Sequence, residues 1–160
     1  MRRTGTRDLA VPFVVIGLTA YVLLRLSYGV IPPLQYVAAV PLAVLTGAEF
    51  VAARRVRAAV RHDPRARAMS ALVIARCVAL GKASSLVGAG MVGAATALLV
   101  RVAPDAHDVK VAANDTRVGV VLLAVALALV AAGLLLERAG IDPGSLDDGR
   151  RGAPDSRDRT

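Results

Sequence analysis

The sequence is short of the residues from which most catalytic and metal sites are built. It holds one cysteine, two histidines and no tryptophan, and only 3% of its residues are aromatic. The lone Cys77 excludes an intramolecular disulfide, and no cysteines and histidines have the spacing of a zinc site. The formal net charge of +8 raises nucleic acid as a partner, but no aromatic rings lie among the cations to stack with bases. We therefore expect no metal, no cofactor and no nucleic-acid partner.

Charged residues are also scarce in four long stretches of the chain, and these stretches supply most of its mass. Hydrophobic residues make up 56% of the sequence, and the charges fall in blocks between the apolar runs. A soluble domain would spread its charges over amphipathic faces instead. The pattern predicts an all-α integral membrane protein: a four-helix transmembrane bundle of two successive hairpins, followed by a disordered C-terminal tail.

The predicted transmembrane domain covers residues 9–138, between a basic N-terminus at 1–8 and a polar tail at 139–160. The tail has too few apolar residues to offset the entropy lost on ordering. A helix needs about 20 apolar residues to cross a hydrocarbon core about 30 Å thick. The predicted spans are residues 9–28, 34–53, 72–100 and 118–136. Because the third span is longer than the core requires, its first two turns are expected at or below the cytoplasmic interface.

The charges of the connecting segments predict the orientation. The loop at 54–67 contains six arginines, namely Arg54, Arg55, Arg57, Arg61, Arg65 and Arg67. The segment at 103–116 is net acidic, and the apolar run after residue 8 is too long for a cleaved signal peptide. Lysine occurs only twice in this alanine-rich and valine-rich chain, which favours a GC-rich bacterial source. The positive-inside rule then predicts a multi-pass protein of a bacterial plasma membrane with both termini cytoplasmic. The same arginines would bind anionic lipid head groups of the bilayer.

Two columns of small residues predict where helices pack. Residues four apart lie on one face of a helix, and small side chains allow close approach of helices in lipid. On the third span the column consists of Gly81, Ser85, Ala89, Gly93 and Ala97. On the fourth span it consists of Ala124, Ala128 and Ala132. These columns could bring the third and fourth spans together, or the first of them could form a homodimer face.

A small set of charged residues lies near the cytoplasmic ends of the predicted spans. It consists of Glu49, Arg76, Lys82 and Glu137. A structural ion pair between Glu49 and Arg76 or Lys82 would lower the cost of placing charges near the lipid, and long basic side chains would reach the head groups. The alternative is a polar cluster that binds an anionic ligand or relays protons. Their spacing selects no reaction, so we predict no enzyme.

The segment before the fourth span contains two short polar motifs. Asp105, His107 and Asp108 could be proposed as metal ligands, but no further ligands lie near them in the sequence. Asn114, Asp115 and Thr116 precede the apolar run, and residues of these types cap helix N-termini. We expect the fourth helix to begin here.

The order of several motifs resembles a known family. They are the turn LSYGVIPPL at 26–34, the AE pair at 48–49, the ARCVALGKASSLVGA stretch at 75–89, the DT pair at 115–116 and LER at 136–138. Together with the basic loop they resemble the uncharacterised family called domain of unknown function 3180. The resemblance implies a small four-helix membrane protein of high-GC Gram-positive bacteria, often encoded beside folate-biosynthesis genes. It assigns no mechanism to any residue.

These observations predict a non-catalytic accessory, scaffold or assembly component of the cell envelope. The alternative is a small transporter or transporter subunit in which the Glu49, Arg76 and Lys82 cluster faces a polar cavity. The expected partners are lipids together with another membrane protein or further copies of this chain.

Overall fold

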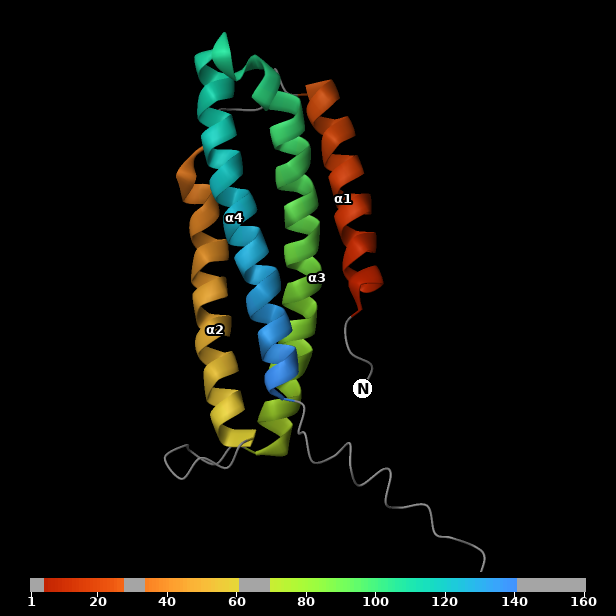
Figure 1. Ribbon diagram of the computed structural model, residues 1–160, viewed down its shortest axis with the longest axis vertical. Helices are drawn as coiled ribbons and strands as arrows, with labels where there is room; N and C mark the ends of the chain where they lie inside the picture. Colours follow the sequence, from red (N-terminus) through yellow and green to blue (C-terminus); the bar gives the residue numbers. More distant parts are fainter. Residues whose placement is uncertain (1–4, 28–33, 61–69, 141–160) are drawn as a thin grey trace, which may run out of the picture.

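The computed structural model describes residues 5–27, 34–60 and 70–140, and the regular elements of these residues are all helical. The elements are α1 (Thr6–Ser27), η2 (Tyr36–Ala39), α2 (Val40–Val60), α3 (Ala71–Val102), η3 (Ala103–His107) and α4 (Lys110–Ala139) (Figure 1). The prediction of an all-α chain with four long helices is therefore confirmed. The predicted turn at 28–33, most of the basic N-terminus and nearly all of the tail lie outside the described residues.

The four long helices are each long and apolar enough to cross a membrane. The chain is a multi-pass membrane protein. Each predicted span overlaps one helix, but the helices run further than the apolar runs do. The second helix continues to Val60, so Arg54, Arg55 and Arg57 are helical and do not belong to a loop. It begins as the 3-10 turn η2 and becomes α-helical at Val40, next to Pro41, whose missing N–H is tolerated in a first turn.

The helices form an open row in the order α1, α3, α4, α2 (Figure 1). The chain runs up and down as two successive hairpins, yet within the described residues α1 and α2 do not touch each other. The hairpin of α3 and α4 lies between them, so α1 packs on α3, and α2 packs on α4 with only slight contact to α3. Among consecutive long helices of the described chain, only α3 and α4 pack extensively on each other.

Glycines explain why α3 and α4 form the centre of the row. A Cβ added to Gly81 would lie 2.7 Å from the carbonyl oxygen of Gly133, and one added to Gly133 would lie 2.6 Å from that of Gly81. The two backbones are therefore in direct contact at this point. Gly93 makes a similar approach to α1, because a Cβ at Gly17 would lie 3.2 Å from the Gly93 backbone. Close backbone approach is the main source of helix affinity in lipid, where apolar side chains gain little by leaving the acyl chains.

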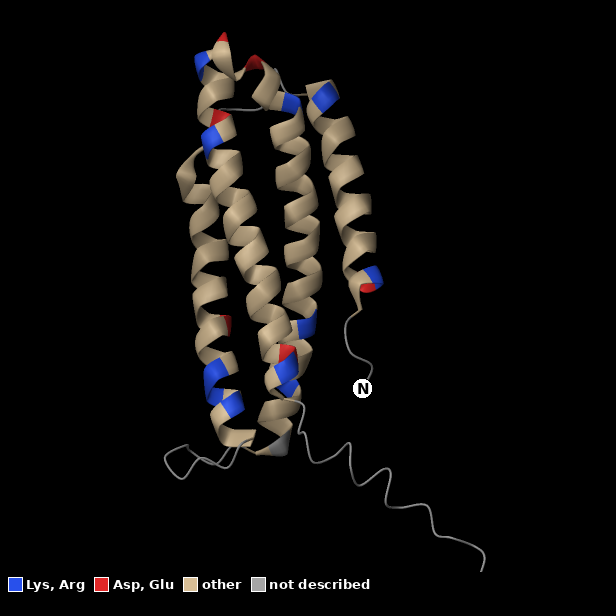
Figure 2. Ribbon diagram, viewed as in Figure 1, with Lys and Arg blue, Asp and Glu red and all other residues tan. Residues whose placement is uncertain are grey.

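Charged residues gather at the two ends of the helices and leave the middle apolar (Figure 2). We call the end where α1 and α3 begin the basic end, and the other the loop end. At the basic end, a cluster of α2 and α4 side chains closes the core, made of Ala53, Val56, Leu136 and Ala139. At the loop end, Arg101 forms an exposed ion pair with Asp105 at 3.0 Å.

The start of α4 differs from the prediction. The helix begins at Lys110, with Val109 as its N-cap, so the interpretation of Asn114 to Thr116 as an N-cap is wrong. These residues lie in the second turn and bind the chain that leads into α2. Asp115 Oδ1 accepts a hydrogen bond from the backbone N–H of Leu34 at 3.0 Å, and Asn114 Nδ2 donates to the carbonyl oxygen of Leu34 at 3.0 Å. This two-bond clamp fixes α2 beside α4.

Candidate functional site

The buried polar residues at the basic end form one layer across three helices. They are Glu49 on α2, Ser84 and Ser85 on α3, and Glu137 on α4, and we call them the polar layer. Glu49 lies about one helical turn before Ala53 of the apolar cluster, and Glu137 is adjacent to Leu136 of the same cluster. The layer is placed there by the contact of Gly81 with Gly133, which brings the α3 and α4 backbones together at the same level.

Glu49 is the most deeply buried charged residue of the described chain, with 1% of its surface exposed. The Ser84 hydroxyl is the polar group that approaches its carboxyl. Neither Oε atom of Glu49 makes a hydrogen bond within the part of the chain that the structure describes. Burying a carboxylate without hydrogen bonds or a counter-charge is costly, so this group requires a compensating partner.

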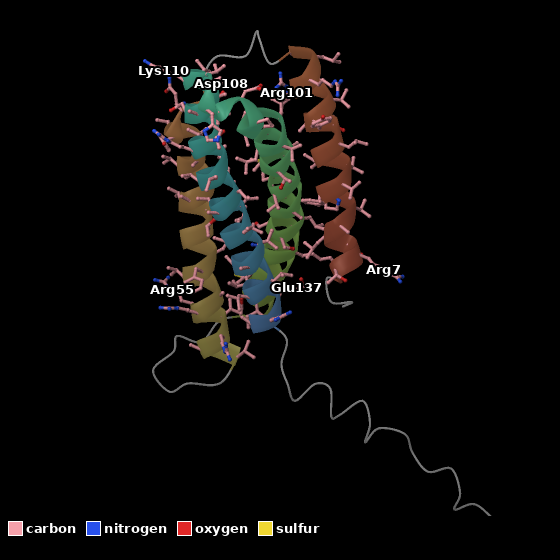
Figure 3. The ribbon with its side chains drawn as sticks, turned by 45° about the horizontal axis from the view of Figure 1, so that its top comes forward. Arg7, Arg55, Arg101, Asp108, Lys110 and Glu137 are labelled. Carbon is pink, nitrogen blue, oxygen red and sulfur yellow. The ribbon has the colours of Figure 1, made fainter. Side chains whose placement is uncertain are left out.

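Glu137 lies where the last turns of α4 cross α3 (Figure 3), with 5% of its surface exposed. Its backbone N would lie 3.0 Å from a Cβ at Gly81, so this turn of α4 rests directly on α3. Ser85 is fully buried, and its hydroxyl donates to the carbonyl oxygen of Lys82 at 2.9 Å. The polar layer therefore contains two carboxyls and two hydroxyls and no cationic side chain.

The structure divides the predicted charged cluster. Arg76 and Lys82 are exposed, whereas Glu49 and Glu137 are buried. No ion pair joins Glu49 to Arg76 or Lys82 among the described residues. The physical reason is the order of the row: α2 packs on α4 and scarcely on α3, so a cation on α3 reaches the head-group region more easily than it reaches Glu49.

Lys82 instead borders a groove of about 820 Å³ between the first turns of α1 and the middle of α3. The groove is lined by Gly5, Thr6, Arg7, Asp8, Val11, Pro12, Lys82 and Leu86. Asp8 is held by the backbone N–H of Gly5, which donates to its Oδ2 at 2.9 Å. The side chain of Arg7 points away from the bundle (Figure 3). Because Lys82 lies beside the start of α1, the first eleven residues of α3 extend beyond α1 at the basic end.

The two predicted small-residue columns differ in burial. All five residues of the α3 column, Gly81, Ser85, Ala89, Gly93 and Ala97, are buried within the chain. On α4, Ala132 is buried, but Ala124 and Ala128 are exposed. The face of α4 that meets the other helices instead contains Gly119, Ala126, Leu129 and Gly133. The α3 column also serves two helices, because Gly81 faces α4 and Gly93 faces α1.

The arginines of the predicted basic loop are only partly within the described chain. Arg54, Arg55 and Arg57 are exposed on the last turns of α2, and Arg55 points outward (Figure 3). The Arg54 guanidinium lies over the ring of Phe50, 4.7 Å from its centroid. Arg61, Arg65 and Arg67 lie outside the described residues. The exposed arginines are free to meet head groups or solvent at the basic end.

Sequence reasoning missed Ser84 as the neighbour of Glu49 and Asp115 as the anchor of α2. Ser84 and Ser85 are adjacent in the sequence, and the spacing by four selected only Ser85. Asp115 carried a signal, since it is an acidic residue next to an apolar run, but helix capping was the simpler explanation. Gly133, one turn before Glu137, is the sequence feature that could have predicted the contact of α4 with α3.

A family model described as a protein of unknown function (DUF3180) matches residues 9–143. The chain belongs to this family, as the resemblance predicted. No curated protein matches it. No solved structure matches it either. The family assigns no activity, so the geometry of the helices must carry the functional argument.

Proposed function

We propose that this protein is a non-catalytic accessory component of a membrane assembly, acting as a subunit or scaffold beside another membrane protein. The observation that carries this proposal is the open row of helices. A transport path or a buried reaction chamber must be lined by protein on all sides, because unsatisfied polar groups are not tolerated against lipid. Four helices in a row, with only a slight further contact of α2 with α3, enclose no such path among the described residues.

The outer helices support the same proposal. No residue of α1 is buried, and α1 packs on one neighbour only. A helix that packs on one neighbour leaves its other faces for lipid or for another protein. An accessory subunit adds its own helices to the surface of a partner, and a single row of spans is suited to that role.

We further propose the bacterial plasma membrane as the location, with both termini in the cytoplasm. The basic end of the described helices carries Arg7, Arg54, Arg55, Arg57, Arg76, Lys82 and Arg138. Among the described residues, the loop end carries four cations, Arg25, Arg101, Lys110 and Arg117. Each end has three acidic residues within this part of the chain, namely Asp8, Glu49 and Glu137 at the basic end and Asp105, Asp108 and Asp115 at the loop end. The excess of arginine at the basic end favours the cytoplasmic side and contact with anionic lipid head groups. Cysteine labelling from each side of sealed vesicles, at Arg57→Cys and Asp108→Cys after Cys77→Ala, tests the orientation.

The accessory role is tested in native membranes. A photo-reactive residue is placed at Leu18 on α1 or Val44 on α2, both exposed, and at the buried Leu129 as the matched control. We expect the exposed positions to cross-link to one other membrane protein in a fixed ratio and Leu129 to give no intermolecular product. Polymer-bounded native discs should contain the same second protein. Discs that hold this chain alone, as a monomer or an oligomer, would contradict the proposal.

A transporter subunit is the second candidate. It is favoured by one observation, the buried carboxyl of Glu49 without a hydrogen bond among the described residues. Intramembrane carboxyls of this kind recur on ion and proton paths. Substrate-dependent thermal stabilisation and flux in proteoliposomes that contain this chain would support this role over the accessory one.

A further inference from the structure

Glu49 lies in surroundings that favour a positive charge. Its side chain is almost fully buried, its two Oε atoms have no hydrogen bond among the described residues, and the hydroxyl of Ser84 lies near its carboxyl. An ionised carboxylate buried there loses its hydration without gaining a hydrogen bond or a counter-charge. The site therefore demands either a proton on the carboxyl or a cation beside it.

The other ionisable groups around Glu49 do not supply that charge. On α4, the buried ionisable neighbour in the layer is Glu137, whose carboxyl has the same sign. On α3, the buried groups are the neutral serines, while Arg76 and Lys82 are exposed. On α2 itself, the following arginines are exposed, and Arg54 lies over the ring of Phe50. Two buried carboxyls without a cationic side chain among them favour a positively charged ligand over the anionic ligand considered from the sequence.

We propose that Glu49 and Ser84 bind one small monovalent cation, a proton or a sodium ion, at the junction of α2 with α3 and α4. The two Oε atoms and the serine hydroxyl are hard oxygen donors that suit either cation. A divalent ion is less suited, because the described residues contain no group of three His, Cys, Asp or Glu side chains. A larger organic cation is excluded because only 1% of the Glu49 surface is exposed.

The bound cation joins α2 to α3. These helices have only slight contact, and α2 is otherwise held by α4. A cation shared by Glu49 on α2 and Ser84 on α3 supplies the missing link between the outer helix and the centre of the row. This inference concerns binding and stability within one chain. It holds or fails independently of the accessory role.

The test uses the full-length protein in lipid nanodiscs. Its thermal unfolding is followed in sodium chloride and in choline chloride of equal ionic strength, and then in choline chloride over a range of pH. If the site takes sodium, Tm rises by several degrees in sodium and one radioactive sodium ion binds per chain. If it takes a proton, Tm rises as the pH falls, and infrared spectra show the carbonyl band of a protonated acid. No response to either cation would overturn the proposal.

Variants assign the response to the site. Glu49→Gln keeps the shape and removes the charge, so it should abolish the response to the cation, and Ser84→Ala should weaken binding several-fold. Asp105→Asn, at the exposed loop end, is the matched control and should respond as the natural protein does. A response that survives Glu49→Gln but disappears in Glu137→Gln would overturn the proposal. If Glu49→Gln fails to fold, the weakened binding in Ser84→Ala still decides the question.

Discussion

The two inner helices each pack on two neighbours, whereas the two outer helices each pack mainly on one. α3 and α4 meet backbone to backbone at Gly81 and Gly133, and 44% of the most apolar window of α3 is buried. For α1 the corresponding share is 0%, although its window is more hydrophobic than that of α3. Hydrophobicity therefore does not decide which helix is central. Burial instead follows the number of neighbours that approach a helix closely. α3 has two such neighbours, α4 at Gly81 and α1 at Gly93, whereas α1 has one. Apolar side chains themselves are solvated equally well by acyl chains.

The outer helices also differ from each other. α1 packs on α3 through apolar and glycine contacts alone, with no polar bond to the rest of the bundle among the described residues. α2 is attached to α4 by an apolar cluster at the basic end and by the clamp on Leu34 at the loop end. We expect α1 to separate from the bundle more easily than α2. The following changes test this order, first at the glycine contacts and then at the polar contacts.

Gly133→Ala should cause the largest loss of stability. The added methyl would overlap the carbonyl oxygen of Gly81 and the backbone N of Ser85, neither of which can move alone. We expect the free energy of unfolding to fall by at least about 2–3 kcal/mol, at the upper end for overpacked cores. Denaturant titration in mixed micelles measures the change.

Gly47→Ala on α2 is the matched control for this substitution. Nothing lies within 4 Å of a Cβ at Gly47, so the change should be neutral or stabilising by up to about 1 kcal/mol, as in exposed helices. Equal losses at Gly133 and Gly47 would remove the distinction between the inner and outer helices.

Gly93→Ala should release α1 and leave the other three helices together. The added methyl would meet the carbonyl oxygen of Phe13 on α1. We expect a smaller loss, about 1–2 kcal/mol, because α1 shares no other helix contact and can move away. Hydrogen exchange should increase in α1 alone. Gly90→Ala meets only the flexible end of Ile16 and should cost less. Increased exchange throughout α4 would show that α1 supports the whole bundle.

The arrangement that these variants probe could be predicted only in part. The four helices followed from the length of the apolar runs, and the buried face of α3 followed from its small residues at Gly81 to Ala97. The order of the helices in the row could not be predicted. Apolar faces are equivalent in lipid, and the sequence does not show which glycines of different helices are in contact. For the same reason Ala124 and Ala128 suggested a packing face that the structure leaves exposed.

The candidate site could likewise be predicted only in part from the sequence. The burial of Glu49 could be expected from a carboxylate within an apolar run, and the interest in Glu137 from its place near a helix end. Their separation from Arg76 and Lys82 depends on α2 packing on α4, which is a property of the helix order. Local spacing cannot reveal a neighbour that lies on another helix.

Asp115→Ala should loosen α2 by a moderate amount. The change removes the acceptor of the Leu34 N–H, a bond of 3.0 Å to a carboxylate that is 3% exposed. We expect a loss of about 1.5–3 kcal/mol for a hydrogen bond to a charged group, part of which Asp115→Asn recovers through its remaining oxygen. Faster hydrogen exchange at Leu34 and at the start of α2 is the measurement. Unchanged exchange there would mean that the apolar cluster at the basic end holds α2 by itself.

Asp105→Ala should have the smallest effect, although it breaks an ion pair of the inner hairpin. Arg101 and Asp105 are 34% and 55% exposed, so water and salt screen their attraction. Exposed pairs one helical turn apart are worth about 0.3–0.5 kcal/mol, and we expect no more than this, decreasing further at high salt. The comparison with Gly133→Ala is informative because both substitutions affect the ends of α3 and α4. If the ion pair proved as important as the glycine contact, the inner hairpin would depend on charge at its loop, and close backbone approach would no longer explain why these two helices lie at the centre.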